Sequence, residues 1–392
     1  MAELLATALS SLPMGLSDEH AMIRESARRF AEEHIAPIAA ELWEEQGFPY
    51  AVWREAAQHG FSGLPYAEQD GGAGGDWLSF AIVLEEFARV DCAIANAFMA
   101  NSSVATLLAE FGDATQKATW LRPILQGEAI GAIALTEPNA GSDAAAIRTR
   151  AERDGDGWRL NGAKTFISNS GTEITGPIVV AAVTGTRPDG RKAISNLVVP
   201  DGTPGLSYGR KLNKIGWRAS STCELFFDDC KVPVENLIGV ENAGFACIMA
   251  NFQSERLSLA IMANMTAQLA LQESLKWARE RQAFGKPVGK FQVLKHRLAE
   301  MATQLEVSRE FTYCQAAQMA AGRSVIKEIS MAKNFATDIA DRLTYDAVQI
   351  MGGMGYMRET LVERLYRDNR ILSIGGGTRE IMNEIIAKQM GL

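Results

Sequence analysis

The chain has 392 residues, of which 47% are hydrophobic and 22% charged, a composition typical of a soluble protein with two or three domains. Its 39 basic and 47 acidic residues give a net charge of −8 at pH 7, which argues against a nucleic-acid partner because such binding needs basic charge facing phosphate. Five scattered cysteines and four distant histidines indicate no metal site. No apolar run approaches the roughly 20 residues that span a bilayer, and no basic segment precedes the apolar N-terminus as in a secretory signal. We therefore expect a cytoplasmic protein.

Apolar residues recur at helical spacing from Ser17 onward, which predicts an N-terminal helical domain over residues 1–128. Ser17 is the expected N-cap of the first helix, with Asp18 and Glu19 in the favourable first turn. The glycine-rich stretch 70–75 is predicted to be a loop between helices. No strand precedes it, and no Lys-Ser or Lys-Thr pair follows it as in a phosphate-binding loop.

The pattern shortens between residues 129 and 240, which predicts a small middle β domain. Asn161-Gly162 is a dipeptide typical of hairpin turns, and it lies between two short apolar runs that we expect to pair. The other expected strands are compact apolar runs separated by Gly, Pro and Asp, at 130–135, 178–183, 193–199 and 223–227.

Long helical periods return after Gly244 and predict a C-terminal helical domain over residues 241–392. Two apolar stripes with spacings of three and four residues each require a partner helix, which favours an antiparallel bundle. The stripes are Leu294, Leu298, Met301 and Leu305, then Ala332, Ala336, Ile339, Leu343, Ala347 and Ile350. The predicted fold class is therefore α+β, with helical, β and helical domains in that order.

Four segments together resemble the acyl-CoA dehydrogenase family: ALTEPNAGSD at 134–143, RQAFGKP at 281–287, QIMGGMGY at 349–356, and the stretch 367–378. The resemblance spans nearly the whole chain and implies the family's fold, with a C-terminal antiparallel four-helix bundle. It also implies an FAD cofactor, an acyl-CoA substrate, and homo-oligomerisation, with a tetramer expected in preference to a dimer.

The first segment suits a flat ligand, because small residues let the backbone approach closely and hydroxyl and N–H groups can bond a polar edge. Taken alone it is equally typical of an ordinary tight turn. Alternation along 165–168 puts Phe166 and Ser168 on one face of a strand, which by itself also fits a half-buried strand with a core Phe. The resemblance implies that Phe166 lies against the flavin ring and Ser168 near its N5. It also implies that FAD is contacted by Ile133, Leu135, Thr136, Gly141, Ser142, Thr378 and Glu380.

Arg281 and Phe284 lie three residues apart on an expected helix or its end, so we expect them to face the same way. A cation beside an aromatic ring suits a dinucleotide, although a surface Arg with a core Phe fits equally. The resemblance implies that the adenosine half of FAD, bound mainly to a neighbouring subunit, is contacted by Arg281, Phe284, Gln292, Gln349 and Gly353, and that Gly352 also contacts FAD. The glycines alone indicate only a helix C-terminus and turn.

Most family members carry the catalytic carboxylate in a Glu-Gly-Thr turn near the C-terminus, but this chain has Gly376-Gly377-Thr378 there. A minority, including the isovaleryl-CoA and long-chain enzymes, places a Glu at the start of a C-terminal-domain helix, in a Glu-Arg-Leu pattern that this chain has at 255–257. Glu255 beside an arginine is alone typical of a solvated helix face. Combined with the glycine at 376, it predicts that Glu255 is the base, with a raised pKa. The resemblance also implies that the N–H of Gly376 stabilises the enolate oxygen.

The predicted reaction is FAD-dependent α,β-dehydrogenation of an acyl-CoA to the trans-2-enoyl-CoA within fatty-acid metabolism, with hydride passing to flavin N5 and electrons to an electron-transferring flavoprotein. Ser142 and Arg256 match family positions that contact CoA, and Gly375 replaces a large residue at the floor of the acyl pocket. Together with Gly376, which replaces the usual glutamate, Gly375 removes much side-chain volume. We therefore expect room for branched or bulky acyl groups, unless another side chain fills the glycine turn. The alternatives are a flavin monooxygenase or desulfinase-like enzyme on the same fold, or a catalytically silent acyl-CoA- or flavin-binding protein.

Overall fold

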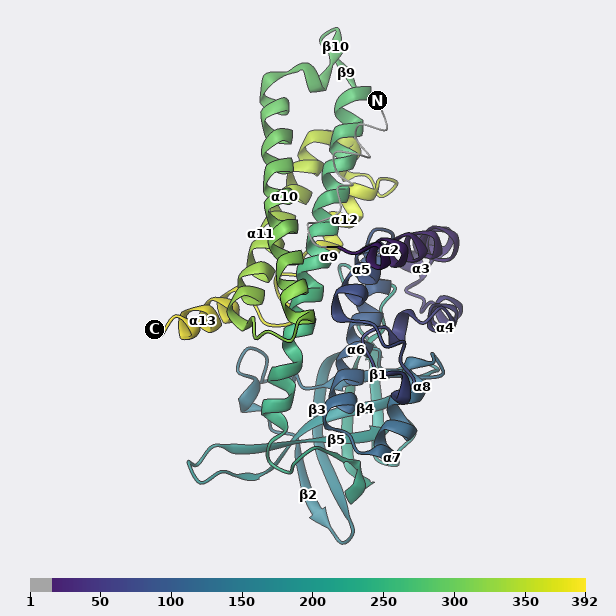
Figure 1. The fold of residues 1–392 in the computed structure, drawn as a ribbon, viewed down its shortest axis with the longest axis vertical. Helices are drawn as coiled ribbons and strands as arrows, with labels where there is room; N and C mark the ends of the chain where they lie inside the picture. Colours follow the sequence, from purple (N-terminus) through teal and green to yellow (C-terminus); the bar gives the residue numbers. More distant parts are fainter. Residues whose placement is uncertain (1–15) are drawn as a thin grey trace.

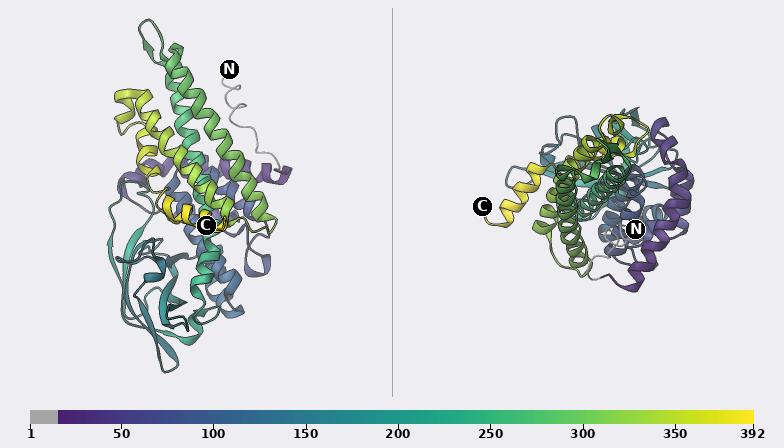
Figure 2. Two further views of the ribbon diagram at one scale, coloured as in Figure 1. Left: turned by 90° about the vertical axis from the view of Figure 1, so that its left-hand side faces the viewer. Right: turned by 90° about the horizontal axis from the view of Figure 1, so that it is seen from above.

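The computed structural model describes residues 16–392; the N-terminal segment on which we based the expectation of no secretory signal lies outside them. The molecule is elongated (Figure 1), with a β sheet at one end and long helices extending to the other. The N-terminal helices lie beside the junction of these two parts, as the turned views in Figure 2 also show. The predicted α+β class and the order helical, β, helical are confirmed.

The N-terminal part begins where the sequence predicts, because the Ser17 hydroxyl accepts a hydrogen bond from the His20 N–H at 3.3 Å. The glycine-rich stretch is a loop before α5, as expected. The helices are α2 (Asp18–Phe30), α3 (Ala36–Glu45), α4 (Tyr50–Gln58), α5 (Trp77–Ala88), α6 (Cys92–Phe111), α7 (Ala114–Gln116) and α8 (Arg122–Leu125). By length and apolar composition α6 would pass as a membrane span, but 89% of the tested window is buried inside the protein, so α6 is a core helix.

The middle part is an eight-stranded sheet with the order β6-β7-β3-β2-β4-β5-β8, and β1 pairs in parallel with β4. Its core contains inward-facing side chains such as Trp158, Leu197 and Leu225. The strands are β1 (Ile130–Ala134), β2 (Arg150–Asp154), β3 (Gly157–Ser168), β4 (Thr175–Thr186), β5 (Lys192–Pro200), β6 (Leu206–Lys211), β7 (Thr222–Pro233) and β8 (Leu237–Ile238).

The predicted hairpin turn at Asn161-Gly162 is wrong. The chain runs through this dipeptide as part of β3, which is paired along its length with β7 and at its start with β2. The register shifts at Gly162, where a Cβ would lie 2.7 Å from the Thr149 Cα. Gly162 is therefore a bulge under close backbone approach rather than a turn. The actual β2–β3 turn follows Asp154.

The C-terminal part is a bundle of three long helices with shorter helices packed against α11. All members of the second predicted stripe are buried, as are three of the four in the first, Leu294 being half-buried. The elements are α9 (Gly244–Glu280), the small hairpin β9 (Gln282–Ala283) and β10 (Lys286–Pro287), α10 (Gln292–Ala320), α11 (Ile326–Met351), α12 (Leu361–Asn369) and α13 (Arg379–Gln389).

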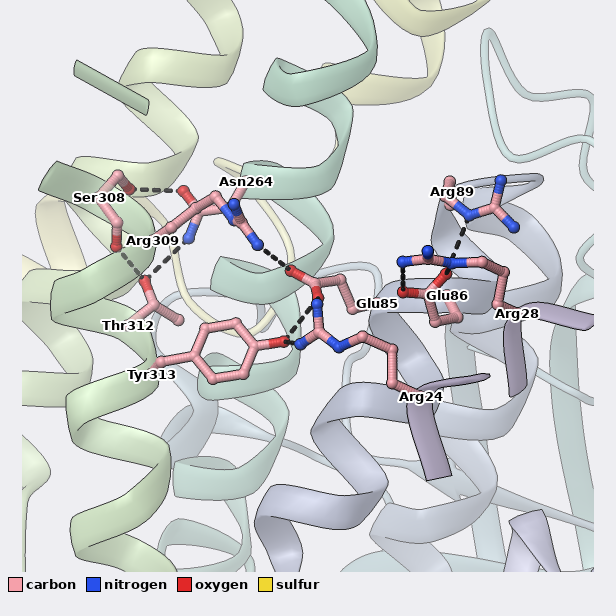
Figure 3. Close-up of polar contacts among 10 residues, drawn as sticks. All are labelled: Arg24, Arg28, Glu85, Glu86, Arg89, Asn264, Ser308, Arg309, Thr312 and Tyr313. Carbon is pink, nitrogen blue, oxygen red and sulfur yellow. Dashed lines mark hydrogen bonds and ion pairs between the residues drawn. The ribbon is translucent and has the colours of Figure 1, made fainter. Parts of the chain in front are cut away.

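A buried ionic cluster, which we call the junction cluster, joins the N-terminal helices to the bundle (Figure 3). Glu85 of α5 accepts a hydrogen bond from the Tyr313 hydroxyl of α10 at 2.6 Å and pairs with Arg24 of α2 at 3.1 Å. Arg309 of α10 lies 3.8 Å from the other carboxylate oxygen. Because both Glu85 and Tyr313 are buried, this cluster fixes α2 and α5 against α10 at a specific register.

Candidate active site

Glu255 lies near the start of α9, the helix that runs from the sheet through the bundle. The helix is held there by Asn251, whose side-chain amide donates to the Ser103 carbonyl of α6 at 2.9 Å. Its neighbours Ser254 and Leu257 are buried, whereas Glu255 keeps part of its surface exposed. The side chain therefore sits in an enclosed position on a rigid element, rather than on a solvated helix face.

Gly376 faces Glu255 across 121 residues of sequence. A Cβ added to Gly376 would lie 3.4 Å from the Glu255 Oε1 and 2.6 Å from the Leu259 Cδ1. Gly376 has a φ of +63°, a conformation that favours glycine. The carboxylate of Glu255 thus occupies the space beside the backbone position where most family members carry their own glutamate.

Burial and the nearby positive charges shift the pKa of Glu255 in opposite directions. Burial raises the pKa of Glu255, while the nearby cations Arg256 and Lys333 lower it, and the net direction is upward. No residue in 16–392 donates a hydrogen bond to this carboxylate, so nothing holds it permanently in the ionised form. A desolvated carboxylate without donors has the properties expected of a general base working near neutral pH.

Arg256 does not point toward an open surface. Its side chain is buried, its Nε donates to the Gly376 carbonyl at 3.1 Å, and its guanidinium lies 5.5 Å from the Phe252 ring. The structure therefore assigns Arg256 a contact with the glycine turn, and its contact with CoA stays a prediction.

Lys333 of α11 is the residue that sequence reasoning missed. Its ammonium group is fully buried and donates to the carbonyls of Gly375, at 2.7 Å, and Gly377. A signal for it was available: Lys333 stands on a second apolar stripe of α11, and a charge on such a stripe demands a specific partner. That stripe is Ile329, Lys333, Ala336, Ala340 and Leu343, all buried.

The two glycines of the turn differ in the room they leave. The nearest atom to a Cβ on Gly375 would be the Ile371 carbonyl oxygen at 3.6 Å, so a side chain there would enter open space. At Gly376 the corresponding space is already filled by Leu259 and Glu255. Only Gly375 therefore contributes to the expected wide pocket. The expectation that both glycines remove side-chain volume is corrected for Gly376.

The loop after β1 is fixed by a buried ion pair. Lys164 of β3 donates to the Glu137 carboxylate at 2.8 Å and to the Leu135 carbonyl at 3.0 Å. Burial lowers the pKa of Lys164 to about 8, whereas hydrogen bonds from Lys164 and from the backbone outweigh burial and lower the pKa of Glu137. This pair locks Thr136 against β3, where the Thr136 carbonyl accepts the Thr165 N–H at 2.9 Å.

The predicted flavin contacts gather around this loop. Phe166 is 68% exposed with a φ of +60°, so its ring is displayed on the surface of the sheet, and Ser168 beside it is also partly exposed. Gly141 and Ser142 are exposed, and a Cβ on Gly141 would meet nothing within 4 Å. An uncovered aromatic ring and an open glycine turn both fit the requirements of a flavin ring. Ile133 and Thr136 are half-buried and Leu135 is buried in the same region.

Two further predicted FAD contacts follow the glycine turn. Thr378 is the N-cap of α13, its hydroxyl accepting the Ile381 N–H at 3.4 Å, and Glu380 is exposed in the first turn of that helix. The chain therefore brings Thr378 next to the segment 375–377 that faces Glu255.

The predicted adenosine contacts lie elsewhere. Arg281 follows the last residue of α9, and Phe284 lies in the loop of the β9–β10 hairpin, which projects from the end of the bundle remote from the sheet (Figure 1). The expectation of a helix or its end holds for Arg281, which is the C-cap of α9, and is wrong for Phe284, which lies beyond the helix with a φ of +52°. Phe284 is 94% exposed, so it is not a core residue.

Antiparallel packing brings the remaining adenosine contacts to that same remote end. Gln292 begins α10, and Gln349, Gly352 and Gly353 lie at the end of α11, which runs in the opposite direction. All four are exposed. Along α9, Glu255 and Arg281 are separated by about 39 Å at 1.5 Å per residue. The chain thus carries two separate groups of predicted FAD contacts, and one protomer does not bring them together.

No group of three His, Cys, Asp or Glu side chains within the described residues is arranged to hold a metal ion. A hollow of about 510 Å³ on the bundle is lined by α11, α12 and Ile215, and it contains none of the predicted site residues. The candidate site is therefore defined by its chemistry at Glu255, Gly376 and Phe166.

Family models for acyl-CoA dehydrogenases match the chain in order: the N-terminal domain at residues 17–128, the middle domain at 132–230 and the C-terminal domain at 242–391. The mitochondrial short-chain specific acyl-CoA dehydrogenase of Mus musculus is 41% identical over 374 residues, covering 95% of this chain and 90% of that protein. The mitochondrial long-chain specific enzyme of Sus scrofa is 39% identical over 376 residues, covering 95% and 87%. Nearly equal identity to enzymes named for different chain lengths leaves the acyl length open.

Solved structures agree with these matches. Butyryl-CoA dehydrogenase from Megasphaera elsdenii superposes with a TM-score of 0.92 at 35% identity, covering 97% of this chain and 100% of that one. PigA, solved with FAD and proline, superposes with a TM-score of 0.91 at 29% identity, covering 97% and 100%. The chain therefore belongs to the acyl-CoA dehydrogenase family, and it is an FAD-dependent oxidoreductase.

Proposed function

We propose that this protein dehydrogenates an acyl-CoA thioester between its α- and β-carbons, with Glu255 as the base that removes the α-proton. The observation that carries the proposal is the approach of the Glu255 carboxylate to the Gly376 backbone, at 3.4 Å from the position of a Gly376 Cβ. A carboxylate supplied from α9 takes the place of the one that the 376–378 turn lacks. The raised pKa of Glu255 supports this role, because a base near neutral pH takes up a proton readily.

FAD, when bound, supplies the acceptor for the hydride that leaves the β-carbon. The chain's own residues supply the remaining groups. The exposed Phe166 and Ser168 and the open turn at Gly141 and Ser142 would hold the flavin ring, and the 375–377 turn would receive the thioester carbonyl.

The test is flavin reduction by a panel of straight and branched acyl-CoAs under anaerobic conditions. Wild-type protein should bleach the oxidised flavin spectrum, and Glu255→Gln should slow that reduction by about 10²- to 10⁴-fold, the usual contribution of a general base. Glu280→Gln, at the exposed far end of the same helix, is the matched control and should leave the rate unchanged. Full-rate bleaching by Glu255→Gln would refute the assignment of the base.

The acyl group is proposed to be branched or bulky near its α- and β-carbons. The open space beside Gly375 supports this, since its nearest neighbour would be 3.6 Å from an added Cβ. The same panel decides: a clear preference for short unbranched chains would contradict the proposal. In a Gly375→Tyr variant, flavin reduction by the branched acyl-CoAs should decrease more than reduction by the straight ones, because the tyrosine ring would enter that space.

We further propose that the enzyme is a homo-oligomer, a tetramer in preference to a dimer, in which FAD bridges two subunits. The separation of about 39 Å along α9 between Glu255 and Arg281 exceeds the length of one dinucleotide, and Phe284 is almost fully exposed. Light scattering gives the subunit number. Arg281→Ala should lower FAD retention, whereas a monomeric protein with full FAD content would exclude a bridging cofactor.

An electron-transferring flavoprotein is the proposed electron acceptor. The test compares the rate at which it reoxidises the reduced enzyme with the rate for an artificial dye.

The alternative of an oxygen-using oxidase or monooxygenase on this fold predicts rapid reoxidation of the enzyme by O₂, and the enclosed base Glu255 argues against it. A silent binding protein would retain FAD and acyl-CoA without any bleaching.

A further inference from the structure

The 375–377 turn has its three consecutive carbonyl groups held by two cationic side chains. Lys333 of α11 donates to the carbonyls of Gly375 and Gly377, and Arg256 of α9 donates to the carbonyl of Gly376 between them. Lys333 is fully buried and Arg256 is 4% exposed. Burying two cations against neutral carbonyl groups is unfavourable compared with neutral donors, so their presence at this turn calls for a reason beyond folding.

The peptide geometry supplies one reason. The carbonyl of Gly375 and the N–H of Gly376 belong to one planar trans peptide unit, so they point in opposite directions. By drawing the Gly375 oxygen toward α11, Lys333 turns the Gly376 N–H away from α11. Within residues 16–392 this N–H donates no hydrogen bond, which leaves it available to a ligand.

The position of Lys333 gives a second reason. The charged groups that act on Glu255 are Arg256 on its own helix and Lys333 on the packed helix α11, and both favour the carboxylate over the acid. Burial lowers the pKa of Lys333 to about 8, and Glu255 opposes that shift. Since its side chain is fully buried, Lys333 itself is out of reach of a substrate proton.

We propose that Lys333 is a positioning residue for the dehydrogenation, which aims the Gly376 N–H at the thioester oxygen and places a positive charge near Glu255. The inference rests on the proposed function. In the step concerned, the α-carbon–hydrogen bond breaks, the proton forms a bond to a Glu255 oxygen, and the electron pair moves onto the thioester carbonyl oxygen. Lys333 fixes the donor for that oxygen from behind, without touching the substrate.

The test isolates this proton step. An acyl-CoA with sulfur in place of the β-carbon cannot lose a β-hydride, so in D₂O the enzyme should only exchange its α-protons, which mass spectrometry follows. Lys333→Met, similar in length but without a charge or donor, should slow this exchange by about 10²- to 10³-fold, the cost of losing an oxyanion donor. The pH midpoint of exchange should also rise, because Glu255 loses a cation that favours its ionised form.

Two readouts do not depend on catalysis. Amide hydrogen exchange of the peptide spanning 371–378 should accelerate in Lys333→Met, since the turn loses two hydrogen bonds. Lys327→Met, on the exposed first turn of the same helix, is the matched control and should change neither the turn's exchange nor the α-proton rate. If Lys333→Met does not fold, Lys333→Gln is measured instead; it keeps a neutral donor, and its pH midpoint should rise in the same way.

The outcomes separate this inference from the proposed function. Absence of α-proton exchange in the wild type, or full exchange in Glu255→Gln, would overturn the proposed function itself. If instead the wild type exchanges, Glu255→Gln does not, and the Lys333 variant matches the wild type in rate and midpoint, only the role of Lys333 is refuted.

Discussion

Glu85 and Glu255 are both carboxylates enclosed by the helices of this protein, and their surroundings are opposite. The Glu85 carboxylate accepts the Tyr313 hydroxyl at 2.6 Å and pairs directly with Arg24 at 3.1 Å. Around Glu255 the cations Arg256 and Lys333 instead direct their hydrogen bonds to the backbone carbonyls of the 375–377 turn. The carboxylate of Glu255 is left desolvated, and no group within residues 16–392 donates a hydrogen bond to it.

This difference separates a structural charge from a reactive one. A buried carboxylate that accepts a hydrogen bond and pairs directly with an arginine, as Glu85 does, holds helices together. A buried carboxylate whose neighbouring cations are occupied elsewhere feels their charge but keeps its lone pairs free, so it can accept a proton. Burial and charge alone therefore do not identify a base; the partners of the surrounding cations do.

The largest expected effect on stability is at the junction cluster. Glu85→Gln should lower the free energy of unfolding by about 3–5 kcal/mol, because it leaves Arg24 and Arg309 near an uncharged group in a buried site. Chemical denaturation measures it. Glu44→Gln is the control: its ion pair with Arg358 also links the N-terminal and C-terminal parts but is exposed, so it should cost at most about 1 kcal/mol. Equal decreases in the free energy of unfolding of the two variants would contradict the distinction between the buried junction cluster and the exposed ion pair.

The next largest effect is expected at the glycine turn. Gly376→Ala places a Cβ at 2.6 Å from Leu259 in a backbone with φ +63°, and it should cost about 1–3 kcal/mol. Gly375→Ala is the matched control one residue earlier. Its Cβ meets only a carbonyl oxygen at 3.6 Å, so stability should stay the same or rise slightly. Thermal unfolding of the two variants side by side checks this, and an unchanged Tm for Gly376→Ala would contradict the close approach of Leu259.

The smallest effect concerns the pH dependence of stability at Glu255. Its pKa in the folded protein is raised above the ordinary 4.5, so the native state favours the protonated form and ionisation destabilises the fold. This cost is absent below about pH 4.5 and grows as the pH rises through the folded pKa. Glu255→Gln carries no such titration, so its Tm relative to the wild type should increase as the pH rises from about 4.5 through the folded pKa of Glu255. A constant Tm difference across that range would show that Glu255 is not desolvated.

Local patterns predicted much of the fold. The cap at Ser17, the strand after residue 129 and the buried stripe through Ile339 and Leu343 are each determined by neighbours a few residues away. The prediction failed at Asn161-Gly162, where a good turn dipeptide lies inside β3. There, pairing with β2 and β7 on both sides outweighs the local preference. It also failed for Phe284, because α9 ends at Glu280, four residues before the position that a helix face shared by Arg281 and Phe284 requires.

The sequence by itself determined the family, the three-part order and the candidate base, because the motifs and the displaced glutamate are properties of residue identity alone. Only the tertiary structure decided what Arg256 and Lys333 do, since both could be read as ordinary helix residues until the turn at 375–377 was placed beside them. It also decided that Gly376 leaves no open space while Gly375 does. The physical reason is that electrostatic and steric effects act through space over a few ångströms, and Glu255 meets its glycine turn from 121 residues away.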